Sequence, residues 1–162
     1  MTVTAVRKDP AALTMEIVSE FTAPLDRAWQ LIADPRQLER WWGPPTHPAT
    51  FTDFDLTPGG RVSYFMTGPD GEQYHGWWTV REVIPPRVLE VQDGFADDEG
   101  EPDPDMPVNI MRVELSDVDG ATTQMTIRST FPTVEAMEQT LAMGAEEGMK
   151  QALSQIDAIL AR

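Results

Sequence analysis

The side chains that could carry metal or acid–base chemistry are few in this sequence. His47 and His75 are the only histidines, and neither belongs to an HxxxH or HExxH pattern, so the ligand spacing of common zinc sites is missing. Cysteine is absent, which excludes disulfides, thiolate catalysis and zinc–thiolate sites. We therefore expect no metal and no cofactor, and we expect both histidines to be solvated or hydrogen-bonded.

Motifs for nucleophilic catalysis and nucleotide binding are missing as well. The chain has no GxSxG turn, and its glycines match neither GxGxxG nor GxxxxGK[ST]. Two carboxylates remain candidates for proton transfer: Asp55 precedes a Pro-Gly-Gly turn, and Glu82 shares the strand parity of Trp78 and Val80. We expect Asp55 to cap its turn and Glu82 to pair with an arginine such as Arg87, because buried carboxylates are usually paired.

Two other acidic segments are predicted to be turns or loops. The sequence Asp117-Val118-Asp119-Gly120 lacks the distal ligands of an EF-hand and is typical of a hairpin turn. Residues 94–107 form an acidic, Pro/Gly-containing segment that is too charged to pack. We expect a solvated loop there, with a docking site for a basic partner or a weak cation site as the alternatives.

Length, composition and charge limit the class of protein. With 162 residues and 41% hydrophobic content the chain suits one domain, residues 1–162. A net charge of −15, from 27 acidic and 12 basic side chains, repels phosphate groups, so we expect no nucleic-acid partner and no membrane. No run approaches the roughly 20 apolar residues of a membrane span, and the N-terminus resembles no secretory signal. We expect a cytoplasmic protein.

The elements that must position the candidate side chains are mostly strands. Alternation of apolar and polar residues predicts strands over residues 14–21, 51–56, 61–67, 72–83, 88–93, 108–116 and 122–130. Gly, Pro and Asp at the connections favour an antiparallel meander. Between the first two strands, Pro24 and the pair Asp34-Pro35 indicate two short helices, the second over residues 36–42.

The C-terminal segment is predicted to be one long helix. From Val134 to Leu160, apolar and small residues recur at steps of three and four, which gives a continuous stripe on a helix about 40 Å long. Such a helix must pack its stripe on the sheet. Gly144 and Gly148 lie in the stripe and would leave room rather than fill it, so we expect a cavity between the helix and the sheet.

Several turn motifs occur in an order that resembles a known family. They are Trp41-Trp42-Gly43-Pro44, the run DLTPGGR at residues 55–61, Gly68-Pro69-Asp70-Gly71, and EVIPPR at residues 82–87. Over roughly residues 14–160 the chain resembles the activator of heat-shock-protein-90 ATPase homologue-like branch of the START-like (SRPBCC) helix-grip superfamily. Met149 stands where relatives often have Trp.

The resemblance implies an α+β, helix-grip fold. In it, an antiparallel sheet of about six to seven strands wraps around a long C-terminal helix, and two short helices follow strand 1. Residues 13–161 would form this core, with residues 1–12 as an N-terminal arm.

We predict that the chain binds a small hydrophobic or aromatic molecule in the cavity. The expected lining combines inward-facing aromatic and methionine side chains with the helix stripe: Trp41, Trp42, Phe54, Tyr64, Met66, Tyr74, Trp78, Met111, Met125, Met137, Leu141, Gly144 and Gly148. One alternative, implied by the family name, is a protein-interaction module that modulates a chaperone ATPase. The other is a cyclase- or hydrolase-like enzyme acting on a polyketide-like substrate, as some relatives are.

Two tryptophan pairs bear on these alternatives. Trp41-Trp42 could gate the cavity, or one of the two could fill the core instead. Trp77 and Trp78 must point to opposite faces of their strand, and we expect Trp78 inside. An exposed Trp77 would suggest a contact surface, so the protein is expected to be a monomer or a homodimer.

Overall fold

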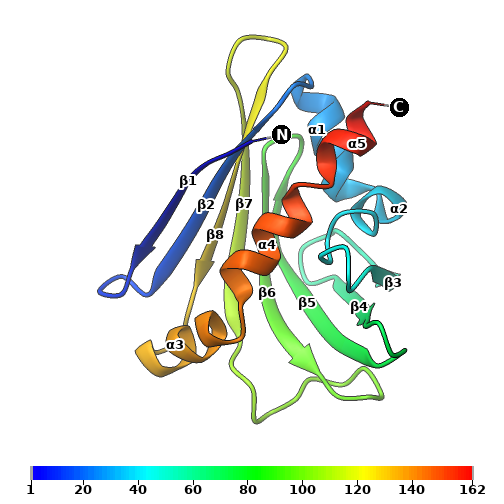
Figure 1. Cartoon of the computed structure of the whole chain (residues 1–162), viewed down its shortest axis with the longest axis vertical. Coiled ribbons are helices and arrows are strands. Elements are labelled where there is room, and N and C mark those ends of the chain that lie inside the picture. The colour runs from blue at the N-terminus through cyan, green and yellow to red at the C-terminus, as the bar shows by residue number, and fades with distance from the viewer. Residues whose placement is uncertain (1, 162) are drawn as a thin grey trace.

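The computed structural model describes residues 2–161, so Met1 and Arg162, the ends of the expected domain, lie outside the described residues. One antiparallel sheet of eight strands has the order β1-β2-β8-β7-β6-β5-β4-β3, and helices lie on its concave face (Figure 1). The strands are β1 (Thr2–Asp9), β2 (Thr14–Phe21), β3 (Ala49–Phe54), β4 (Arg61–Thr67), β5 (Gln73–Ile84), β6 (Val88–Ala96), β7 (Asn109–Asp117) and β8 (Thr123–Thr130). The helices are α1 (Leu25–Ala33), α2 (Pro35–Leu38), α3 (Val134–Ala142), α4 (Ala145–Leu153) and α5 (Ile156–Leu160).

The sheet contains one strand more than the six to seven expected. Residues 2–9 of the expected N-terminal arm form β1, which pairs with β2. A register shift between Val3 and Ala5 allows Val3 and Val6, three positions apart, both to pack against the core. A search for strictly alternating apolar residues does not detect this strand, because a bulge changes which residues share a face.

The C-terminal helix is interrupted rather than continuous. Thr133 caps α3 by accepting a hydrogen bond from the Ala136 amide at 3.0 Å. At Gly144 the chain enters the left-handed region, with φ of 83°, and the helix then restarts as α4 in a new direction (Figure 1). Glycine adopts this conformation without the penalty that a Cβ would bring. The expectation of one unbroken stripe is therefore wrong at this point.

Two β-bulges decide which side chains face the helices. In β3 the register shifts between Phe51 and Asp53, so Phe51 and Phe54 are on one face and their rings pack with centroids 6.0 Å apart. In β5 the register shifts between Val80 and Glu82, and Glu82 turns to the outer face. There Glu82 pairs with Arg112 at 3.5 Å rather than with Arg87.

The outer-face tryptophan and the start of the acidic segment both make specific contacts. Trp78 is buried, as predicted, whereas Trp77 lies half-buried over Gly94 on the outer face and donates to the Phe95 carbonyl at 3.0 Å. Because β6 continues to Ala96, the first three residues of the expected loop belong to a strand. The Asp97 carboxylate then accepts backbone N–H bonds from two residues of the following turn.

The other acidic turns behave as predicted. Asp117 accepts a hydrogen bond from the Gly120 amide at 2.7 Å in the hairpin between β7 and β8. Asp55 accepts from the Thr57 hydroxyl at 2.7 Å beside the Pro-Gly-Gly turn. Both carboxylates thus stabilise turns.

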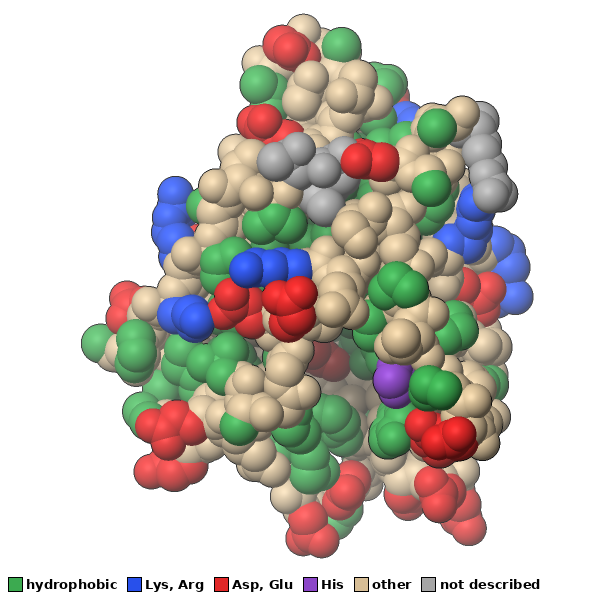
Figure 2. All heavy atoms as spheres, in the orientation of Figure 1, with side chains coloured by type: hydrophobic (Ala, Val, Ile, Leu, Met, Phe, Trp, Pro, Cys, Tyr) green, Lys and Arg blue, Asp and Glu red, His purple; other side chains and the backbone are tan. Residues whose placement is uncertain are grey.

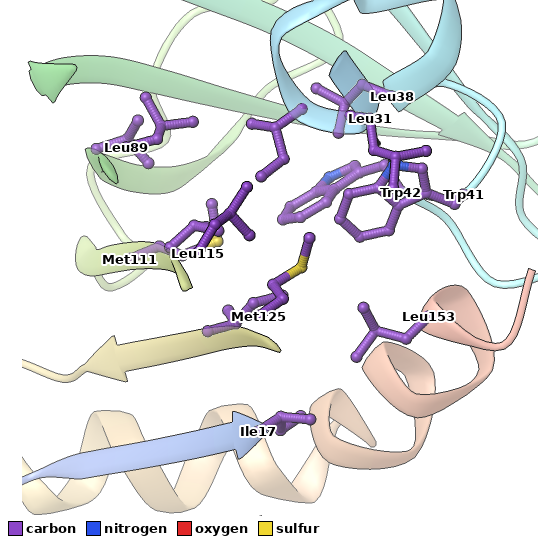
Figure 3. Packing of buried hydrophobic residues seen from close by; sticks show 14 of the residues in the cluster. Ile17, Leu31, Leu38, Trp41, Trp42, Leu89, Met111, Leu115, Met125 and Leu153 are labelled. Carbon is purple, nitrogen blue, oxygen red and sulfur yellow. Dashed lines mark hydrogen bonds between the residues drawn. The ribbon is translucent and has the colours of Figure 1, made fainter. Parts of the chain in front are cut away.

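One part of the space between sheet and helices is tightly packed. Side chains from β2, β7 and β8 converge there with side chains from α1, α2 and α4 (Figure 3). Trp41 is 1% exposed, and its Nε1 donates to the Leu31 carbonyl at 2.8 Å. The side-chain amide of Gln155 donates to the Gly43 carbonyl at 2.7 Å, which ties the end of α4 to the loop after α2.

The first turn of α4 is fixed to β1 by charge. Glu146 pairs with Lys8 at 2.6 Å and with Lys150 at 3.2 Å, and these are the only lysines in the chain. Lys8, followed by Lys150, holds the pKa of the Glu146 carboxyl below its ordinary value. Among residues 2–161, no helix has the length and apolar character needed to cross a bilayer.

Candidate functional site

Two adjoining pockets lie between the sheet and the C-terminal helices. The inner pocket is the more enclosed, has a volume of about 170 Å³, and is lined by Met15, Ile17, Trp42, Tyr64, Asp93, Gly94, Phe95, Asn109, Met111, Ile127, Ser129, Phe131, Thr140, Ala145 and Met149. The outer pocket, about 450 Å³, is lined by Trp42, Pro44, His47, Tyr64, Met66, Tyr74, Phe95, Thr140, Met143, Ala145, Gly148 and Met149. Six lining residues are common to both. Figure 2 shows the face of the molecule that is hollowed below α4.

One cross-strand row brings polar groups to the floor of the inner pocket. Trp78 of β5 pairs with Asp93 of β6, and Asp93 pairs with Asn109 of β7. Side chains at paired positions share a face of the sheet. The acid and the amide are therefore neighbours, and both line the inner pocket.

Asp93 is a half-buried acid without a partner among the described residues. Its carboxylate forms no hydrogen bond or ion pair with any residue in the range 2–161. Burial removes the charged form from water and raises the pKa of Asp93 to about 7. At neutral pH this group is therefore able either to accept a proton or to hold a cation.

Tyr64 reaches the pocket because the residue opposite it has no side chain. Gly76 pairs with Tyr64 across β4 and β5, and a Cβ on Gly76 would lie 2.5 Å from the Tyr64 hydroxyl oxygen. Burial, followed by the charge of Asp93, raises the pKa of the Tyr64 hydroxyl, and the indoles of Trp42 and Trp78 oppose that rise. The phenol is therefore neutral at physiological pH.

Three buried polar atoms make no hydrogen bond within the described chain: Trp42 Nε1 and Asn109 Oδ1, whose residues line the inner pocket, and Trp78 Nε1, whose residue is in the adjoining core. Each such group costs about 1–3 kcal/mol when it is left unpaired, and buried polar groups are normally satisfied. Two of the three belong to residues of one pocket, which indicates a place where something else supplies hydrogen bonds.

The outer pocket is mostly apolar and opens to solvent. Tyr74 is 55% exposed at its edge, and its ring lies 5.7 Å from that of His47. A Cβ on Gly148 would meet no atom within 4 Å. The glycine in α4 therefore leaves room at this mouth, as expected from the helix stripe.

The predicted lining residues divide between the pockets and the packed core. Trp42 and Tyr64 line both pockets, Met111 lines the inner one, and Met66, Tyr74 and Gly148 line the outer one. Trp41, Trp78, Met125 and Met137 are buried in the core, and Leu141 packs against it. Phe54 packs against the ring of Phe51 and also borders a hollow on the outer side of β3 and β4. Gly144 forms the break before α4.

The polar floor was missed, although its signal is present in the sequence. Asp93 continues the inward parity of Leu89 and Val91, and Asn109 begins the parity of Met111 and Val113. Ser129 likewise follows Ile127 in β8 and lines the inner pocket. These polar residues on otherwise apolar parities are absent from the lining predicted from the sequence.

Glu82, a candidate for proton transfer, and His75 both lie outside the two pockets. Glu82 is on the outer face, and the His75 ring packs on Phe65 with centroids 5.6 Å apart, beside the hollow outside β4. Among residues 2–161, no three His, Cys, Asp or Glu side chains are grouped as metal ligands.

Comparison with known proteins supplies the family. Protein Ms6760 from Mycobacterium smegmatis is 50% identical over 98% of this chain and 97% of its own, with a TM-score of 0.91. A protein from Arthrobacter aurescens is 49% identical over 99% of this chain and 92% of its own, with a TM-score of 0.94. The AHSA1 protein from Silicibacter pomeroyi shares the fold at 20% identity, covering 91% of this chain and 97% of its own, with a TM-score of 0.74.

No curated protein matches the sequence. The sequence profile described as Activator of Hsp90 ATPase homolog 1-like protein, however, matches residues 22–161. Together with the antiparallel sheet and the C-terminal helices, this match places the chain in the Activator of Hsp90 ATPase homolog 1-like family, within the START-like helix-grip fold.

Proposed function

We propose that this protein binds a small, largely apolar molecule in the joined inner and outer pockets. The observation that carries the proposal is an apolar cavity whose floor holds unpaired polar atoms. Ligand sites typically combine apolar walls with a few convergent polar groups, in volumes of about 300–1,000 Å³. A family name alone would not support a ligand, because one fold serves many functions.

The size of the pockets agrees with an aromatic ligand. The inner pocket, at about 170 Å³, is close to the cavity of about 150 Å³ that accommodates benzene in another protein. The outer pocket would take the remainder of a longer molecule. Burying about 200 Å² of apolar ligand surface contributes about 5 kcal/mol before association costs, so only a ligand that fills both pockets binds well.

Methionine supports some tolerance of ligand shape. Met66, Met111 and Met149 line the two pockets, and the flexible thioether side chain adapts to differently shaped partners. Tyr74 and Met143 are exposed apolar side chains that also line the outer pocket. Ligand binding accounts for their exposure, so no protein partner such as a chaperone is needed to explain it.

The test is a titration with the neutral fluorophore N-phenyl-1-naphthylamine, followed by its emission and by quenching of tryptophan. We expect saturable binding with micromolar affinity. The Gly148→Leu variant fills the mouth and should bind at least tenfold more weakly. Gln151→Leu is the matched control, since Gln151 is exposed on α4 and lines neither pocket, and it should bind like the parent.

Two results would contradict the proposal: no binding of the fluorophore, or equal binding by the Gly148→Leu variant. The same samples also address the enzymatic alternative, in which Asp93 acts as a general base. A bound compound that is recovered unchanged favours binding alone. Turnover that is lost in Asp93→Asn would favour an enzyme.

A further inference from the structure

The floor of the inner pocket has a chemical character that restricts the ligand further. Its lining includes the Asp93 carboxylate and the side-chain amide of Asn109, which come from neighbouring strands. Asn109 is 8% exposed and its Oδ1 has no partner within the described chain. Neither the carboxylate nor this amide oxygen accepts a hydrogen bond from residues 2–161, and a ligand that donates hydrogen bonds would satisfy the carboxylate.

No side chain supplies the missing positive charge. Among the described residues that line either pocket there is no Lys or Arg, and Asp93 is the only acid. An isolated carboxylate in an apolar cavity is costly unless a cation accompanies it. The protein as a whole carries a net charge of −15, which attracts cations and repels anions over long range.

Aromatic rings enclose the same floor. Trp42 and Tyr64 line the inner pocket with ring centroids 6.2 Å apart, and Trp78 lies 5.0 Å from Trp42 and 5.9 Å from Tyr64. Faces of tryptophan and tyrosine attract an ammonium group through the ring quadrupole, and several rings together form the recognised cage for organic cations. The rings and the carboxylate thus favour the same kind of group.

We propose that the ligand is an organic amine with an aromatic or otherwise apolar body, and that its cationic nitrogen binds at the inner-pocket floor between Asp93, Asn109 and the surrounding aromatic rings. The apolar body extends along the methionines toward the outer pocket. This inference rests on the proposed function, because it names the class of ligand for the same cavity.

Protonation of Asp93 should make binding of the cation depend on pH. In the free protein the pKa of Asp93 is about 7, so the carboxylate is available above that pH and is lost as the pH falls. Of the groups that line the inner pocket only Tyr64 can also titrate, and the outer pocket adds His47 and Tyr74. Affinity for a cation should therefore fall by about tenfold between pH 8 and pH 6.

The experiment compares two molecules of the same shape: 1-naphthylmethylamine, which is a cation at both pH values, and the neutral 1-naphthalenemethanol. Each is titrated as a competitor of N-phenyl-1-naphthylamine. At pH 8 we expect the amine to bind at least tenfold more tightly than the alcohol. At pH 6 the preference should shrink to a few-fold or less while alcohol binding persists, and repeating the profile with His47→Gln separates the outer-pocket histidine from Asp93.

The Asp93→Asn variant should lose the preference for the amine at pH 8. Glu138→Gln is the matched control, since Glu138 is exposed on α3 and lines neither pocket, and it removes one negative charge without touching the floor. It should keep the preference. Binding of the alcohol by Asp93→Asn verifies that this variant is folded.

The outcomes separate the two proposals. If the alcohol and the amine bind the parent equally, or if Asp93→Asn keeps the preference, the inference is overturned while the proposed function stands. If neither naphthyl compound nor the fluorophore binds, the proposed function itself fails.

Discussion

Trp41 and Trp42 are neighbours in sequence but belong to two different regions of the space under α4. Trp41 is in the packed region, 1% exposed, with its Nε1 bound to the Leu31 carbonyl. Trp42 is 6% exposed and lines both pockets, and its Nε1 has no partner within the described chain. The rings contact each other edge to face at 5.8 Å. The boundary between core and site therefore passes between two adjacent residues.

The difference shows that apolar composition alone does not distinguish a core from a binding site. Both regions are built from aromatic and aliphatic side chains. What separates them is whether polar atoms are satisfied and whether atoms fill the space between sheet and helix. Sites commonly keep groups that cost stability, because a ligand repays that cost when it binds.

The largest expected effect is a difference in stability between variants of the two tryptophans. Trp41→Ala removes a filled core position and a hydrogen bond, and we expect a loss of about 3–5 kcal/mol in the free energy of unfolding. Trp42→Ala removes a side chain that already borders open space and has no hydrogen bond to lose, so we expect less than half of that loss, together with loss of fluorophore binding. Urea unfolding of both variants measures the difference. Equal losses would show that the packed and open regions are energetically alike.

A smaller effect should come from Asp93, with a defined dependence on pH. Its pKa is raised from 3.8 to about 7 in the folded protein, so the folded state binds the proton more tightly than the unfolded state. This acid therefore lowers stability progressively as the pH rises from about 4 to 7, and the loss is constant above pH 7. Asp93→Asn should be more stable than the parent by about 1–3 kcal/mol at pH 8.

The measurement is urea unfolding of Asp93→Asn and of the parent at several pH values, and the gain is the difference between their free energies of unfolding. The gain should be near zero at pH 4 and should level off above pH 7. A gain that is independent of pH would mean that Asp93 is not desolvated at the pocket floor.

The smallest effect concerns two glycines of the C-terminal helices. Gly148 lies within α4 and has space for a Cβ, so Gly148→Ala should stabilise the fold by about 0.5–1 kcal/mol through helix propensity. Gly144 has a φ of 83°, and Gly144→Ala should destabilise by about 1 kcal/mol or more despite equal space. Thermal unfolding of the two variants gives opposite shifts in Tm. Shifts of the same sign would argue against the left-handed break before α4.

Strand periodicity was sufficient to predict most of the fold. The seven predicted strands are present, and the turn motifs together with the family resemblance led to the sheet and the helix-grip arrangement. The bulges at β3 and β5 were not predictable, because an inserted residue is recognised only from the pairing of two strands. The shared face of Phe51 and Phe54 and the outward turn of Glu82 both follow from them.

The site was predictable only in part, for a different reason. Aromatic and methionine positions were found because their parity was apolar, but parity does not tell which inward residues meet a filled core and which meet a cavity. Met125 and Met111 share that pattern, yet Met125 is packed in the core and Met111 lines the inner pocket. Position along the strands separates them, because Met111 pairs with Ser129, which also lines the pocket, whereas Met125 pairs with the buried Leu115.

The two lysines that meet Glu146 affect how this protein can be handled in the laboratory. Lys8 and Lys150 carry all the side-chain amines of the chain, and both pair with Glu146 in the first turn of α4, Lys8 from β1 and Lys150 from the last turn of the same helix. Amine-reactive dyes, biotin reagents and surface-coupling chemistry that modify these side chains therefore act on the ion pairs that join β1 to the helix covering the pockets. Attachment through a cysteine introduced at a distant turn would leave the cover intact, and labelling at the lysines would serve as a direct reporter on it.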